Sequence, residues 1–195
     1  MFNDLIQESP LVGIEPIIAS SSSGMSGRFQ LTERPFMTLL TLRGNGAMFH
    51  AAVERVLGVA LPTASGERAV AGERVAIWMG PDEWLIQSTQ DMAADLERGF
   101  REALGSQYYA VVDVSSGYTV IDIEGANVRA VLASGCPLDL HPRAFVEGQC
   151  AQTHFFKAGI TLCRNGDDRF QVILRRSFAE YGCLMLLDAA QPYLV

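Results

Sequence analysis

The chain has 195 residues, of which 49% are hydrophobic and 19% are charged, and its formal net charge is −7 at pH 7. This composition is typical of a globular protein with a sizeable core and argues against a disordered chain. The 15 basic residues are scattered without a run, so we expect no nucleic-acid partner. The longest apolar stretches, such as residues 184–187, are far below the roughly 20 residues that span a bilayer, so we expect no membrane partner.

The first ten residues, MFNDLIQESP, contain neither the basic nor the apolar region of a secretory signal peptide. The four cysteines are widely spaced and include no C-x-x-C pair; they are Cys136, Cys150, Cys163 and Cys183. Such spacing suits reduced thiols inside a cell better than a disulfide framework. We therefore expect a cytoplasmic protein.

The first half of the chain predicts strands that alternate with helices. We expect strands at residues 14–20, 36–43, 75–79 and 84–88, and helices at residues 47–57 and 91–104. Gly58 should end the first helix, because glycine adopts the left-handed conformation without the strain of a Cβ. Residues 61–72 predict a polar loop, and Pro81 favours a tight turn between the two strands that flank it.

The stretch from residue 111 to 140, VVDVSSGYTVIDIEGANVRAVLASGCPLDL, has the clearest pattern. Residues 108–115 and 118–124 alternate apolar and polar residues as half-buried strands do, so they form either a hairpin or two sequential strands. Residues 126–133 predict a short helix. We expect Gly135 to end this helix in the left-handed conformation.

The order of elements then repeats, with strands expected at residues 149–156, 160–164 and 170–174. Ser177 and Glu180 have the spacing of a capping box at the start of a last helix, which should run to about residue 190. Each half is thus a β-α-β-β-α unit, the ferredoxin-like supersecondary pattern. We predict an α+β fold of two pseudo-symmetric halves, residues 1–107 and 108–195, that share one core.

Three separated phrases carry a family resemblance, namely GPDEWLI, GCPLDLHPRAF and LRRSFAEYGCLML. In this order they resemble the gamma subunits of heterotetrameric sarcosine oxidases. The stretch DVSSGYTVIDIEGANVRAVLASGCPLDL also resembles the glycine-cleavage T-protein, a tetrahydrofolate-dependent aminomethyltransferase. The resemblance implies a T-protein-like folate-binding fold within a cytoplasmic bacterial complex, with alpha, beta and delta subunits as partners.

The same resemblance implies FAD, FMN, NAD and tetrahydrofolate for the whole complex, with the cofactors held by the other chains. No catalytic, cofactor-binding or metal site is then expected in this chain, whose role would be the assembly and shape of the enzyme that oxidatively demethylates sarcosine. In the T-protein family a carboxylate beside the folate, usually from an Asp pair, falls just before the strand expected at residues 160–164. This chain has Ala158 and Gly159 there, and neither side chain can act as a general acid or base.

The folate-contacting Asn of the T-protein family falls near Leu174 and Arg175, which is a second departure. A fold that has lost its site therefore fits better than a working transferase. Other sites have weak support. Two Cys and His pairs have loose metal-like spacing but no close cysteine pair, and Gly44-Asn45-Gly46 lacks the third glycine and the lysine of a phosphate loop.

Aromatic and arginine side chains carry much of the binding energy at protein interfaces. On this basis the candidate interface residues are Trp84, Arg175, Arg176, Phe178 and Tyr181. For Trp84 and Phe178 the alternative is a place in the core, because large apolar side chains are more often buried.

Three functions stay open at this point. The first is a non-catalytic subunit of a sarcosine oxidase complex. The second is a free-standing folate-binding protein or transferase of the T-protein class, and the third is a structural homodimer.

Overall fold

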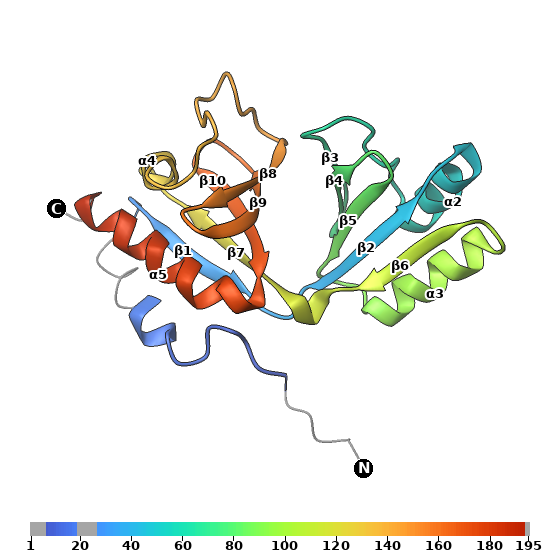
Figure 1. Cartoon of the computed structure of the whole chain (residues 1–195), viewed down its shortest axis with the longest axis horizontal. Helices are drawn as coiled ribbons and strands as arrows, with labels where there is room; N and C mark the ends of the chain where they lie inside the picture. Colours follow the sequence, from blue (N-terminus) through green and yellow to red (C-terminus); the bar gives the residue numbers. More distant parts are fainter. Residues whose placement is uncertain (1–6, 19–26, 194–195) are drawn as a thin grey trace, which may run out of the picture.

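The computed structural model describes residues 7–18 and 27–193. It contains two five-stranded sheets in which every pairing of strands is antiparallel. Figure 1 shows that each sheet carries helices on its outer side and turns its other face toward the second sheet. The predicted α+β class is confirmed.

The first sheet has the strand order β3-β4-β5-β2-β6. Its strands are β2 (Thr38–Gly44), β3 (Arg68–Ala71), β4 (Arg74–Gly80), β5 (Glu83–Ser88) and β6 (Tyr109–Asp113). Two helices cover its outer face, α2 (Ala47–Leu57) and α3 (Ala93–Leu104). Between the helices and the sheet lies a core that includes Phe49, Trp84 and Phe100.

The second sheet has the strand order β1-β7-β10-β9-β8. Its strands are β1 (Gln30–Arg34), β7 (Tyr118–Glu124), β8 (Cys150–Phe155), β9 (Ala158–Arg164) and β10 (Arg169–Arg175). The helices α4 (Val128–Ala133) and α5 (Ala179–Ala190) cover its outer face. Short 3-10 turns precede β7 and α5, at Ser115–Gly117 and Arg176–Phe178, and a third, Gln191–Tyr193, follows α5.

The two halves repeat the same order of elements, but each half has two strands more than the predicted β-α-β-β-α unit. Each half is β-β-α-β-β-β-α. In the first half the additional strands are β1 and β3, and β3 lies inside the stretch of residues 61–72 that was expected to be a polar loop. The strand β3 has only four residues, RAVA, none of them buried, so it lacks the alternation that marks a strand in sequence. The strand β1 was not predicted either, and it has only one buried residue, Leu31.

The two sheets exchange edge strands along the chain. The strand β1 pairs with β7 of the second sheet, and β6 pairs with β2 of the first. The predicted halves divide the chain between residues 107 and 108. Each sheet therefore contains one strand from the other half: β6 lies in the first sheet and β1 lies in the second. Of the two alternatives for residues 108–124, the sequential strands are confirmed, since β6 and β7 lie in different sheets.

Several predicted element ends are confirmed and others are wrong. Gly58 ends α2 with a left-handed φ of 80°, as predicted. Gly135 is not left-handed; a Cβ there would lie 2.6 Å from the ring of Phe156, so close packing requires this glycine. The capping box at Ser177 is also wrong, because Arg176–Phe178 form a 3-10 turn and no side chain caps α5.

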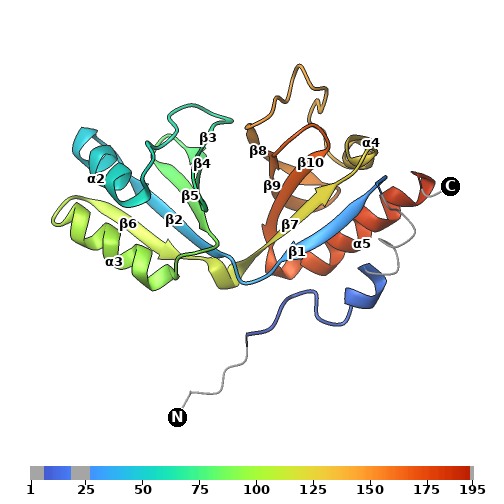
Figure 2. The ribbon, with the colours of Figure 1, turned by 180° about the vertical axis from the view of Figure 1, so that it is seen from behind.

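The strand predicted at residues 14–20 is wrong within the described part of the chain. Residues 15–18 are helical, with the N–H groups of Ile17 and Ile18 both donating to the carbonyl of Ile14 at 3.0 Å. Figures 1 and 2 both show this N-terminal segment beside α5. Leu11 is 1% exposed and belongs to the core of the second sheet.

An ion pair joins three elements of the first half. The Arg74 guanidinium on β4 donates to both carboxylate oxygens of Asp91, at 2.7 and 2.9 Å, and to the Val56 carbonyl of α2 at 2.9 Å. The hydroxyl of Ser88 also donates to Asp91, at 2.8 Å. These hydrogen bonds, that of Arg74 foremost, lower the pKa of Asp91 against the opposing effect of burial.

A first prediction concerns Asp91, whose lowered pKa means that its ionised form stabilises the folded chain above its unfolded pKa of about 3.9. This contribution is lost as the pH falls through the lower, folded pKa. We expect Asp91→Asn to reduce the free energy of unfolding at pH 7 by about 1–3 kcal/mol. The difference from the parent chain should shrink at about pH 3, as measured by urea unfolding.

Asp95→Asn is the matched control, because the Asp95–Arg98 pair on α3 is exposed on both sides. Its effect should stay within about 0.5 kcal/mol at either pH. Equal losses for the two variants, or a loss at Asp91 that does not depend on pH, would contradict the assignment.

Candidate functional site

The inner faces of the two sheets meet in an apolar cluster. Because side chains alternate across a strand, each central strand sends one set of side chains to its helices and the other set to the facing sheet. The buried members of this inter-sheet cluster are Leu39, Ile77, Leu85, Val120, Cys150, Cys163 and Ile173. A hydrogen bond also crosses between the sheets, from the Gln152 side chain to the Met79 carbonyl at 2.7 Å.

Next to this cluster lies a groove of about 250 Å³ between the sheets. We call it the inter-sheet groove. It is lined by Thr41, Met79, Glu83, Leu85, Tyr118, Gln152, Thr153, Gly159, Ile160, Thr161, Ile173 and Arg175. Its wall is therefore apolar near the cluster, and the charged residues lie near the ends of their strands, at Glu83 on β5 and Arg175 on β10.

The two positions at which the sequence departs from the T-protein pattern come together at this groove. Gly159 and Arg175 both line it, from the neighbouring strands β9 and β10. Ala158 is fully buried and packs in the core of the second sheet, so only position 159 faces the groove. Neither Ala158 nor Gly159 can supply a carboxylate there. Of the two residues near which the family's Asn is expected, Leu174 and Arg175, the groove is lined by Arg175.

One carboxylate does line the groove, and sequence reasoning missed it. Glu83 comes from the facing sheet and forms an ion pair with Arg43 at 2.6 Å. The two residues are neighbours because β2 pairs with β5 in a register that sets Arg43 opposite Glu83. Since they are 40 residues apart in the chain, no local pattern could have shown the contact.

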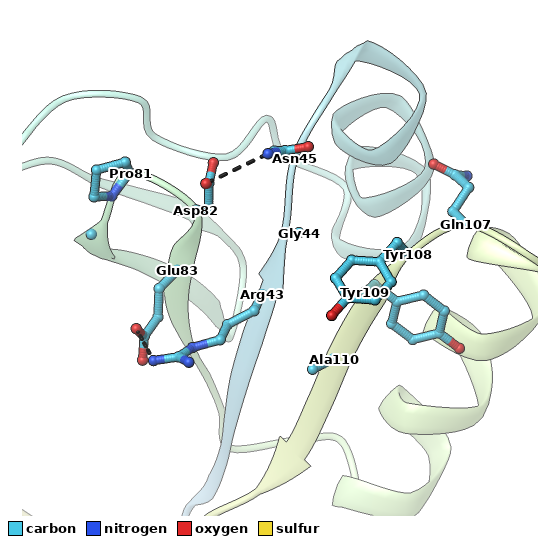
Figure 3. Close-up of a pocket in the computed structure, with 11 residues that line it drawn as sticks. Arg43, Gly44, Asn45, Pro81, Asp82, Glu83, Gln107, Tyr108, Tyr109 and Ala110 are labelled. Atoms are coloured by element: carbon cyan, nitrogen blue, oxygen red, sulfur yellow. Dashed lines mark hydrogen bonds and ion pairs between the residues drawn. The ribbon is translucent and has the colours of Figure 1, made fainter.

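A second hollow, of about 790 Å³, lies at the edge of the first sheet (Figure 3). It is formed by the end of β2, the turn between β4 and β5, and the start of β6, where Tyr108 is 99% exposed. Gly44 and Asn45 line it, and Asn45 donates to Asp82 at 3.5 Å. Arg43 and Glu83 also line this hollow and pair with each other, so the uncompensated charge in the lining is the carboxylate of Asp82, which disfavours a phosphate here.

The structure corrects the interface assignment of Trp84. This side chain is 1% exposed, packs in the core under α2 and α3, and donates its Nε1–H to the Pro62 carbonyl at 2.8 Å. The indole also contacts the rings of Phe49 and His50, with centroids 5.9 and 5.4 Å away. Trp84 is therefore a core residue, which was the alternative considered from the sequence.

The other candidate interface residues lie together where β10 passes into α5. Phe178 is 40% exposed and meets Tyr181 edge to face, with 6.4 Å between ring centroids. Arg176 is exposed and donates to the Glu8 carbonyl at 2.8 Å. Arg175 lies over the ring of Tyr118, 5.8 Å from its centroid. We call these four residues, Arg175, Arg176, Phe178 and Tyr181, the arginine–aromatic face.

The cysteines are not paired with one another in disulfides. All four are buried and free. Burial raises the pKa of Cys183 to about 12, and a hydrogen bond to Cys150 together with burial raises the pKa of Cys163. Within residues 7–18 and 27–193 no three Cys, His, Asp or Glu side chains are grouped so as to hold a metal ion.

Comparison with known proteins agrees with the fold. Residues 43–192 match the model of a family described as sarcosine oxidase, gamma subunit. A sarcosine oxidase subunit gamma of Corynebacterium sp. (strain U-96) is 32% identical over 96% of this chain and 92% of its own length. One from Arthrobacter sp. is 33% identical over the same shares of both chains.

Two solved structures are also similar. A chain of the heterotetrameric sarcosine oxidase from Corynebacterium sp. U-96, in complex with pyrrole 2-carboxylate, matches at a TM-score of 0.88 and 31% identity over 98% of both chains. The glycine cleavage system aminomethyltransferase T of Bartonella henselae matches at a TM-score of 0.61 and 16% identity, over 87% of this chain and 48% of that one. The second likeness concerns the fold alone, and it bears out the T-protein-like architecture.

Proposed function

The chain belongs to the sarcosine oxidase gamma subunit family, and on that premise we propose that it is a non-catalytic gamma subunit of a tetrahydrofolate-dependent heterotetrameric sarcosine oxidase. The observation that carries the proposal is the likeness to a chain of such an enzyme over 98% of both lengths. In this role the chain contributes to the assembly and shape of the complex that oxidatively demethylates sarcosine. Its partners are the alpha, beta and delta subunits.

We further propose that FAD, FMN, NAD and tetrahydrofolate are held by those partners. The sequence has no glycine-rich dinucleotide fingerprint, which supports this assignment for the flavins and NAD. The four free, buried cysteines support a cytoplasmic location for the complex. In the part of the chain that the structure describes, no helix is long and apolar enough to cross a bilayer.

A free-standing folate-binding or aminomethyltransferase-like protein is the second candidate, because the fold resembles that of an aminomethyltransferase. The inter-sheet groove does not fit this function. Gly159 faces it where the family places a carboxylate, and its volume of about 250 Å³ is below the roughly 300–1,000 Å³ that drug-sized ligands occupy.

A second prediction follows for tetrahydrofolate. Titration calorimetry of the complete chain should give weak binding or none, because Gly159 stands where the T-protein pattern has its carboxylate, and Glu83, the carboxylate in the lining, is paired with Arg43. A dissociation constant in the low micromolar range, about −7 to −8 kcal/mol, would instead favour the folate-binding candidate.

A third prediction concerns the arginine–aromatic face, which we propose as a contact with the other subunits. A stable complex should bury upward of roughly 1,000 Å², with aromatic and arginine anchors at its centre. We expect Phe178→Ala and Arg176→Glu each to weaken assembly by about 2 kcal/mol or more, which is about 30-fold. Both side chains are exposed, so the chain's own fold should persist.

Coexpression with the other three subunits, followed by size-exclusion chromatography, measures this effect. Arg169→Glu is the matched control, because Arg169 lies at the opposite end of β10 and its side chain is 74% exposed. Assembly should tolerate that change. A fully active complex that forms without this chain would overturn the subunit role itself, whereas normal assembly of both variants would overturn only the choice of face.

A further inference from the structure

The inter-sheet groove contains hydrogen-bond donors that the chain itself leaves unused. Arg175 lies over the Tyr118 ring, and no carboxylate of a described residue lies within 4 Å of its guanidinium. Thr161 is only 8% exposed, and its hydroxyl has no hydrogen-bond partner among the described residues. A cation and a nearly buried hydroxyl in one groove are the groups that bind a carboxylate.

The strand register places both donors next to one position on the inner face that no side chain fills. Tyr118 pairs with Arg175, and His154 pairs with Gly159. Leu174 pairs with Ile160, so continuing that register by one residue sets Gly159 beside Arg175. Gly159 has no side chain, and a Cβ added there would meet nothing within 4 Å. The inner face of the sheet therefore has a one-side-chain gap on β9 beside the cation on β10.

Thr161 borders the same gap along β9. It lies two residues from Gly159 on β9, hence on the same face of the sheet, and pairs with Ile173 on one side and Gln152 on the other. Same-face neighbours at this spacing lie about 7 Å apart, so one carboxylate in the gap is within reach of both the Arg175 guanidinium and the Thr161 hydroxyl.

The rest of the groove suits the apolar part of such a ligand. Leu85 and Ile173 are buried members of the inter-sheet cluster and form its floor. The one carboxylate in the lining, Glu83, is already paired with Arg43 at 2.6 Å, so it leaves the charge of Arg175 uncompensated. The volume of about 250 Å³ limits the ligand to a small molecule.

We propose that the inter-sheet groove binds a small organic carboxylate. The carboxylate occupies the gap at Gly159 and accepts hydrogen bonds from Arg175 and Thr161, and the apolar body of the ligand packs on Leu85 and Ile173. This inference concerns the chain's own groove and does not depend on the proposed subunit role.

The test uses benzoate as a probe, because it combines a carboxylate with a compact apolar ring. We expect amide chemical shifts of the complete chain, followed by NMR, to change at residues of the inter-sheet groove with a dissociation constant of the order of 1 mM or tighter. Benzamide has the same shape without the charge and should bind at least about 10-fold more weakly. Equal affinity for the two probes would overturn the proposal, as would shifts confined to the hollow beside Tyr108.

Variants test the two parts of the site separately. Arg175→Gln should weaken benzoate binding about 10-fold or more, whereas Arg169→Gln, which removes the same charge from the far end of β10, should leave it unchanged. Gly159→Val should abolish binding by filling the gap, and the open space around Gly159 allows the chain to keep its fold. Equal effects of the two arginine variants, or undiminished binding to Gly159→Val, would refute the carboxylate site.

Discussion

The structure depends on the burial of each sheet's inner face against the other sheet. The central strands β5 and β10 each bury apolar side chains on both faces: in β10, Val172 and Leu174 pack on the helix side, and Ile173 packs against the facing sheet. A single half would leave that inner face in water, at about 25 cal/mol for each Å² of apolar surface exposed. The two halves therefore form one body, although each has its own helices and its own outer core.

The same packing creates the inter-sheet groove. Where the buried cluster of Leu85, Val120 and Ile173 ends, the inner faces carry polar side chains such as Thr41 and Gln152. This part of the fold is where the T-protein pattern would place its carboxylate, and here Gly159 leaves a gap beside Arg175. The architecture is retained and the side chains in the groove are different, as fits a chain whose proposed task is assembly.

Local patterns predicted most of the elements. The helix at Ala47–Leu57 and the strand at Tyr118–Glu124 have the predicted bounds, because each carries its own periodicity. The strands β1 and β3 were missed because edge strands with few buried residues have no such signal. Trp84 was misassigned as an interface candidate because its type says nothing about exposure, which depends on α2 and α3 packing over it.

The sequence by itself determined the α+β class, the repeat of two halves, the absence of an ionisable side chain at Ala158 and Gly159, and the family. These features depend only on residue identity and on short-range spacing along the chain. Only the tertiary structure decided that β1 and β6 exchange sheets, that Glu83 and Arg43 pair across 40 residues, and that Arg175, Thr161 and Gly159 border one gap. The physical reason is that these contacts depend on strand register and on the packing of two sheets. Both are determined jointly by residues that are distant in the chain.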